Sequence, residues 1–141
     1  MKKTLCLLLV LVLTMGLTAT FSFADNIGNG DVSSYSTAGV AFYTKRVSNT
    51  KAIVSVDVEF TKKADDYVVA IVLQKKTSSG WVTATDLSNS VHYYRGSNST
   101  SVLTYDEWKV KKGAVYRIKC VSTDKYDSGI EYKRTTYSDP F

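Results

Sequence analysis

Alternation of apolar and polar residues is the clearest pattern in the chain, and it predicts β-strands. Across residues 52–61, apolar side chains occupy every second position and mostly polar ones lie between them. A period of two places the first set on one face of a strand, whereas a helix would distribute the same residues around its axis. Residues 114–122 alternate in the same way. The expected core face of this later strand consists of Ala114, Tyr116, Ile118 and Cys120.

Shorter runs predict further strands with turns between them. Residues 67–73 are apolar on both faces, which indicates a central strand. The charged segment 62–66 and the polar segment 96–99 have the composition of turns. The other expected strands cover residues 81–85, 90–95, 100–105 and 130–137. About seven or eight short antiparallel strands without a helix indicate an all-β fold, a single Greek-key β-sandwich, with a small barrel as the alternative.

The first residues predict a cleaved signal peptide. Met1-Lys2-Lys3 is basic, residues 4–20 carry a long apolar run, and Ser22-Phe23-Ala24 fits a cleavage site. We therefore expect a signal peptide at 1–24, a flexible leader rich in Gly, Ser and Asn at 25–39, and a sandwich domain at 40–141. No second apolar stretch has the length of a membrane span, so the mature chain is expected to be secreted without one.

Cysteine and histidine are too few for a disulfide framework or a zinc site. Cys6 lies in the signal segment, which leaves Cys120 alone in the mature chain. A structural zinc site needs four ligands, and His92 is the sole histidine. We interpret Cys120 as a small buried hydrophobic residue. No metal or cofactor is expected, and the scarcity of cysteine suits a secreted protein of a Gram-positive bacterium.

Catalysis through histidine is not favoured. A Ser–His–Asp or Cys–His arrangement would have to use His92, and no nucleophile-elbow sequence accompanies it. Within Val91-His92-Tyr93-Tyr94, His92 is expected to be a solvent-facing strand residue.

Carboxylates offer two weak alternatives. Asp57 with Glu59, or Asp106 with Glu107, would be candidates for glycoside hydrolysis. The second pair is expected in a turn beside Trp108, where carboxylates ordinarily serve solubility. Residues 65–66 and 124–127 each provide two carboxylates, but their spacing matches no EF-hand calcium loop. The sequence therefore predicts a non-catalytic protein.

Two segments resemble known domains. Residues 73–82, with Leu-Gln before the turn and Gly-Trp after it, resemble a hairpin of small secreted sandwich domains. Residues 113–121 followed by Gly129-Ile130-Glu131 are similar to the last strands of immunoglobulin-like and fibronectin type III-like domains. In that comparison Tyr116 takes the place of the strand aromatic and Trp81 that of a core tryptophan. The order of these motifs along residues 67–137 also resembles uncharacterised exported proteins of Gram-positive bacteria. This resemblance implies export and a sandwich but no activity.

Charge does not indicate nucleic acid as a partner. The formal net charge of the whole chain is +5, and lysines come in pairs at expected turns, where they discourage edge-to-edge pairing of strands. No phosphate-binding glycine loop is present. A small positive charge is compatible with weak attraction to an anionic cell wall.

Tyrosine abundance provides the candidate binding residues. The chain has ten tyrosines, and neighbouring strand residues point to opposite faces, so one of Tyr93 and Tyr94 must face outward. Tyr126 is expected to be exposed in the last hairpin loop. The candidate ligand-binding residues are Tyr93, Tyr94, Arg95 and Tyr126.

The favoured function is that of a secreted, non-catalytic binding protein. An aromatic ring beside a guanidinium suits a sugar or an anionic group, so the expected partner is an extracellular or cell-wall ligand: a glycan, a wall polymer or a protein. The alternative is a secreted effector or antimicrobial-type protein that acts on neighbouring cells. A small hydrolase is the third possibility, and the missing catalytic constellation weighs against it.

Overall fold

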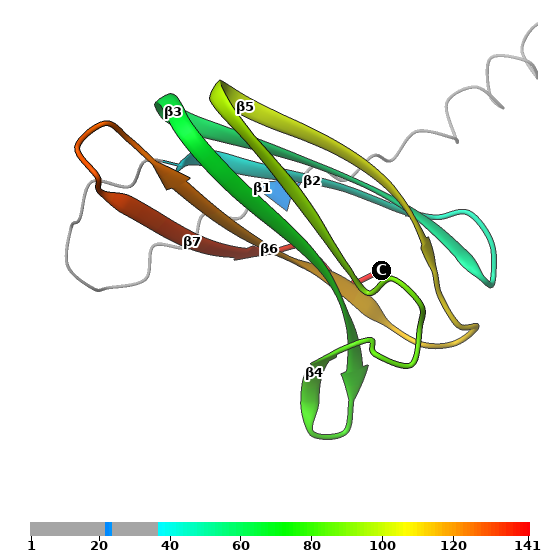
Figure 1. Ribbon diagram of the computed structural model, residues 1–141. Coiled ribbons are helices and arrows are strands. Elements are labelled where there is room, and N and C mark those ends of the chain that lie inside the picture. Colours follow the sequence, from blue (N-terminus) through cyan, green and yellow to red (C-terminus); the bar gives the residue numbers. More distant parts are fainter. Residues whose placement is uncertain (1–21, 24–36) are drawn as a thin grey trace, which may run out of the picture.

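The computed structural model describes residues 22–23 and 37–141, and every regular element in these ranges is an antiparallel β-strand. The all-β prediction is confirmed. The strands are β1 (Ser22–Phe23), β2 (Thr37–Arg46), β3 (Lys51–Thr77), β4 (Gly80–Thr83), β5 (Val91–Lys109), β6 (Tyr116–Lys125) and β7 (Glu131–Tyr137) (Figure 1). Most of the predicted signal peptide and leader lie outside the described residues.

The first described strands lie at the edge of the sheet. β1 comes from the predicted signal segment and pairs with β2 at Ala41 and Phe42. β2 begins at Thr37, three residues before Val40, where the sequence placed the start of the domain. β2 then pairs along its length with the first half of β3.

Two long strands, β3 and β5, organise the sheet. The sequence predicted a turn at 62–66 and another at 96–99, but β3 and β5 continue through these segments and pair with each other on both sides of them. The register shifts between Glu59 and Ala64, which is a bulge, and Asn98 opposite this region has a positive φ of 54°. Bulges bend and twist the strands that carry them, so these polar segments curl a continuous ribbon.

The curl divides the sheet into two halves that share β3 and β5. In the first half, residues 52–59 of β3 lie between β2 and residues 101–108 of β5. In the second half, residues 66–72 of β3 lie between residues 91–97 of β5 and β6, and β7 follows on the far side of β6. β4 forms a short hairpin on the end of β3 (Figure 1).

One hydrophobic core lies inside the curled sheet. The predicted alternation is confirmed: the apolar residues at even positions from 52 to 60 are all buried. On β6, Tyr116, Ile118 and Cys120 are buried as expected, and Ala114 before the strand is half-buried. Burial raises the pKa of the Cys120 thiol to about 12, as expected for a structural cysteine.

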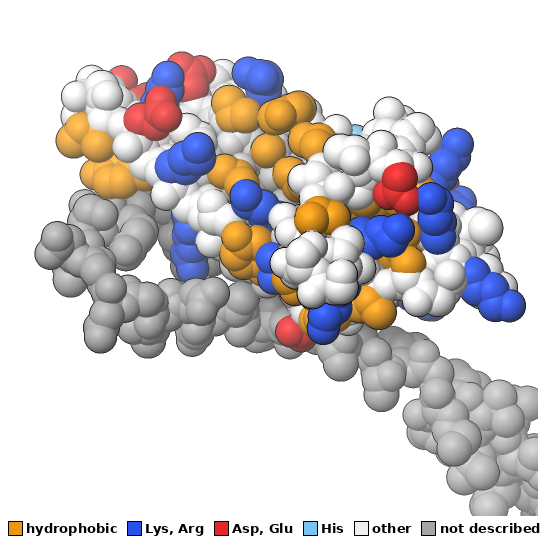
Figure 2. Space-filling view, turned by 90° about the horizontal axis from the view of Figure 1, so that it is seen from below, with side chains coloured by type: hydrophobic (Ala, Val, Ile, Leu, Met, Phe, Trp, Pro, Cys, Tyr) orange, Lys and Arg blue, Asp and Glu red, His pale blue; other side chains and the backbone are white. Residues whose placement is uncertain are grey.

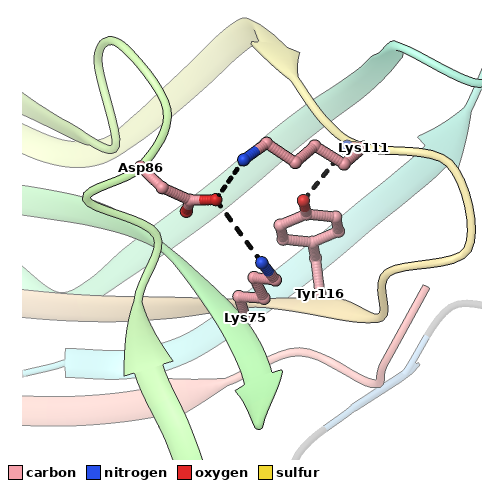
Figure 3. A network of polar contacts seen from close by, with 4 residues as sticks. All are labelled: Lys75, Asp86, Lys111 and Tyr116. Carbon is pink, nitrogen blue, oxygen red and sulfur yellow. Dashed lines mark hydrogen bonds and ion pairs between the residues drawn. The ribbon is translucent and has the colours of Figure 1, made fainter.

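A polar network closes one end of the sheet (Figure 3). Asp86, in the loop between β4 and β5, accepts hydrogen bonds from Lys111 at 2.5 Å and from Lys75 at 3.4 Å. The backbone N–H of Lys111 donates to the Tyr116 hydroxyl at 3.0 Å. The hydrogen bond to Lys111 lowers the pKa of Asp86, and that carboxylate raises the pKa of Lys111. The network therefore joins the β4–β5 loop to the β5–β6 connection.

Candidate ligand-binding groove

A groove of about 480 Å³ lies across β5, β3 and β6 in the second half of the sheet. Pairing in register brings its residues together: Asp66 pairs with Ser97 and Lys125, and Val68 pairs with Arg95 and Thr123. These side chains lie on the outer face, because the alternate residues of the same strands contribute to the core. The groove is lined by Asp66, Tyr67, Val68, Arg95, Gly96, Ser97, Thr123 and Lys125.

Gly96 lines the groove, and the Tyr67 side chain occupies the space on its inward side that a Cβ atom would need. A Cβ atom at this position would overlap the hydroxyl end of the Tyr67 side chain. Tyr67 packs against the core and contacts Phe60, with 5.5 Å between the ring centroids and the rings tilted by 37°. Tyrosine therefore covers the inward side of the glycine, while the backbone of Gly96 lines the groove on the outer side.

Of the predicted binding residues, Arg95 lines this groove and Tyr93 lies beside Arg95. Tyr93 is 62% exposed, and the Arg95 guanidinium lies 5.7 Å from the centre of its ring. The two residues are separated by one position on β5, so they share the outer face. Their side chains form a flat aromatic surface with an adjacent cation and donors.

Tyr94 and Tyr126 lie elsewhere. Tyr94 points inward, and its hydroxyl donates to Asp106 Oδ1 at 2.6 Å. Burial and the Asp106 carboxylate raise the pKa of Tyr94. The expectation that Tyr126 is exposed is wrong: it is 5% exposed and belongs to the core, with Lys62 4.3 Å above its ring. The reason is that the bend of β3 brings Lys62 over the last hairpin. Lys62 and Tyr126 are far apart in the sequence, so the sequence pattern does not reveal this contact.

The outer face around the groove carries more basic than acidic side chains. Lys125 forms an ion pair with Glu131 at 3.1 Å, and Asp66 is the other carboxylate that shares this face among the described residues. Figure 2 shows a face of the molecule on which Lys and Arg side chains are spread between hydrophobic ones. The basic residues that the register places on the groove face are Lys76, Arg95, Arg117, Lys119, Lys125 and Lys133.

An aromatic–cation stack extends the same face beyond the groove. The Arg117 guanidinium lies 4.5 Å from the Trp81 ring centre and 4.1 Å from that of Tyr137. Its Nε donates to Gln74 Oε1 at 2.9 Å, which fixes the guanidinium plane. Trp81, placed by resemblance in a core position, is instead half-buried on the outer side of the β4 hairpin. Sequence reasoning missed this stack because its members come from different strands.

A second polar cluster lies on the inward side, between the two halves of β5. His92 Nδ1 and Asp106 Oδ1 are 2.5 Å apart, and the His92 ring stacks on Trp108 with 4.3 Å between centroids. The prediction of a solvent-facing His92 is wrong, since its side chain is 28% exposed and points at Asp106. The expected turn at Asp106 and Glu107 is also wrong, because both lie on β5. The contact between His92 and Asp106 therefore joins the two halves of β5 on either side of its bend.

Of the two carboxylate pairs considered for catalysis, Asp106 and Glu107 point to opposite faces of β5, whereas Asp57 and Glu59 do not separate in this way. Asp106 is buried inside the sheet, while Glu107 points outward and pairs with Lys51 at 2.6 Å. Asp57 and Glu59 share the outer face of β3. In residues 22–23 and 37–141, no group of three or more His, Cys, Asp or Glu side chains is arranged to hold a metal ion.

Comparison of the chain with protein-family models, with curated proteins and with solved structures finds no match. The described part of the chain contains no helix that is long and apolar enough to cross a membrane.

Proposed function

We propose that this protein is exported and binds an anionic extracellular polymer, such as a cell-wall glycan or phosphate-containing wall polymer, in the groove on the outer face of β3, β5 and β6. One observation carries the proposal: Arg95 and Lys125 line an open groove, and the exposed ring of Tyr93 lies next to the Arg95 guanidinium, 5.7 Å from it.

The groove side chains have complementary roles toward such a ligand. Tyr93 offers a ring face on which a sugar can stack with little loss of side-chain freedom. Arg95 and Lys125 supply cationic donors, and an Arg fork fits a carboxylate or phosphate with two parallel hydrogen bonds. Ser97 and Thr123 add hydroxyls that bond sugar hydroxyls. The basic residues that continue along the face extend this attraction to neighbouring units of a chain polymer.

Within the same proposal, the two halves of the curled sheet correspond to the two layers of a Greek-key sandwich. Support comes from the single core that both halves enclose. The resemblance to exported Gram-positive proteins stays a prediction, and so does the alternative of an effector that acts on neighbouring cells.

Export is expected to remove residues 1–24. The basic start, the apolar run and Ser22-Phe23-Ala24 favour cleavage before Asp25. N-terminal sequencing of the protein from culture medium should therefore begin at Asp25. A product that retains Met1, or that stays with the cells, would contradict export.

Binding is expected to weaken at least about tenfold in a Tyr93→Ala, Arg95→Ala double variant, a loss of about 1.4 kcal/mol. The probe is purified Gram-positive cell wall, used before and after chemical extraction of its phosphate-containing polymers. The protein should sediment with the intact wall and far less with the extracted wall, because the cations of the groove then lose their anionic partners.

The matched control for this test is Lys112→Ala, which removes an exposed cation from the connection between β5 and β6, outside the groove. It should leave wall binding nearly unchanged, and circular dichroism should show that all variants are folded. Equal binding by the double variant and the original protein would place the site elsewhere. Equal binding to intact and extracted wall would exclude the anionic polymer.

A further inference from the structure

The outer face of the first half of the sheet is exposed and apolar at its centre. In register, Tyr105, Ser55 and Tyr43 form one row across the strands, and Leu103 lies in the next row beside Asp57. The Leu103 side chain is 73% exposed and that of Tyr105 is 64% exposed, so no other part of the chain covers them. We call this surface the tyrosine face; its apolar residues are Tyr43, Ile53, Leu103 and Tyr105.

Charges are separated along the strands of the tyrosine face. At the end near the β2–β3 hairpin lie Lys45 and Lys109, together with Lys51, which pairs with Glu107 at 2.6 Å. At the opposite end, toward the bend of β3, lie Asp57 and Glu59. The face is thus basic at one end, apolar in the middle and acidic at the other end.

We propose that the tyrosine face binds a second copy of this chain. A surface with opposite charges at its two ends is complementary to itself when one copy runs antiparallel to the other. A two-fold axis in the plane of the interface and perpendicular to the strands produces this arrangement. The Lys45 end of each copy then meets the Asp57 end of its partner, and the rings of Tyr43 and Tyr105 pack in the centre.

The symmetry makes the contact closed, so association stops at a dimer. The polymer-binding groove lies on the other half of the sheet and stays open in both copies. If the proposed function holds, two grooves on one particle would strengthen attachment to a repetitive polymer. The dimer itself does not depend on that function, since its test contains no polymer.

Sedimentation equilibrium of the purified protein over a range of concentrations tests the proposal. The protein should dimerise, and Leu103→Lys should raise the dissociation constant at least about tenfold by placing a charge in the apolar centre. Added salt should also weaken the dimer, because the end charges are exposed and screened. A monomer at every concentration up to about 1 mM, at low salt, would overturn the proposal.

A charge exchange distinguishes this contact from unspecific association. The double variant Asp57→Lys, Glu59→Lys is basic at both ends, and the double variant Lys45→Glu, Lys109→Glu is acidic at both ends. Each alone should be monomeric, and an equal mixture of the two should form a heterodimer. Circular dichroism checks that each is folded. Dimers of either variant alone as stable as the original, or a mixture that stays monomeric while the original dimerises, would refute the antiparallel arrangement.

Discussion

Replacing Trp108 by alanine is expected to lower the free energy of unfolding by about 3–5 kcal/mol. The Trp108 side chain is 2% exposed, stacks on His92 and lies opposite Ala52 in the register of β3 and β5. Truncation removes a large buried surface and leaves a space that neighbouring strands cannot close, since their backbones are fixed by the ladder. Urea unfolding monitored by far-UV circular dichroism measures the change.

Tyr93→Ala is the matched control for Trp108→Ala, because it removes an exposed aromatic ring from the same strand. Its effect on the free energy of unfolding should stay within about 0.5 kcal/mol. If the two variants were destabilised equally, Trp108 would not belong to the core, and the curl that buries it would be wrong.

Ile118→Ala is expected to cost about 2–5 kcal/mol and Ile118→Val about 0.5–1.5 kcal/mol. Ile118 is fully buried opposite Leu73, and its backbone N–H donates to the Ser138 hydroxyl at 2.9 Å. The graded pair separates the loss of buried methyl groups from any general sensitivity of β6. Urea unfolding provides the free energies.

Cys120 supplies an independent readout for the Ile118 variants. It is buried on the same face of β6, and its raised pKa keeps the thiol protonated at pH 8. A thiol reagent should therefore label it only when the chain opens, and faster in Ile118→Ala than in Ile118→Val. Rapid labelling of the original protein would show that the two faces of β6 are interchanged.

Strand faces could be predicted from the sequence, whereas strand ends could not. The period of two in residues 52–61 and 114–122 needs only local information, and the buried faces agree with it. The segments 62–66 and 96–99 have the residues of turns, yet they pair with each other as the bend of one ribbon. A bend at the surface and a turn both need polar, flexible residues, so composition does not distinguish them.

The candidate site was predictable in part for the same reason. Strand alternation requires Tyr93 or Tyr94 to point outward, and the structure places Tyr93 there with Arg95. Burial of Tyr126 depends on Lys62 and the bend of β3, and the position of His92 depends on Asp106 from the other half of β5. These contacts form only after the sheet curls, so local sequence patterns do not predict them.

The continuity of β3 and β5 has a consequence for cooperativity. Because both strands run without interruption through the two halves of the sheet, no linker exists in residues 51–77 at which one half could unfold while the other persists. Hydrogen exchange should then show amides before and after the bend opening in a single global event with a shared free energy. The bend thus gives a small protein two outer surfaces while it remains a single folding unit.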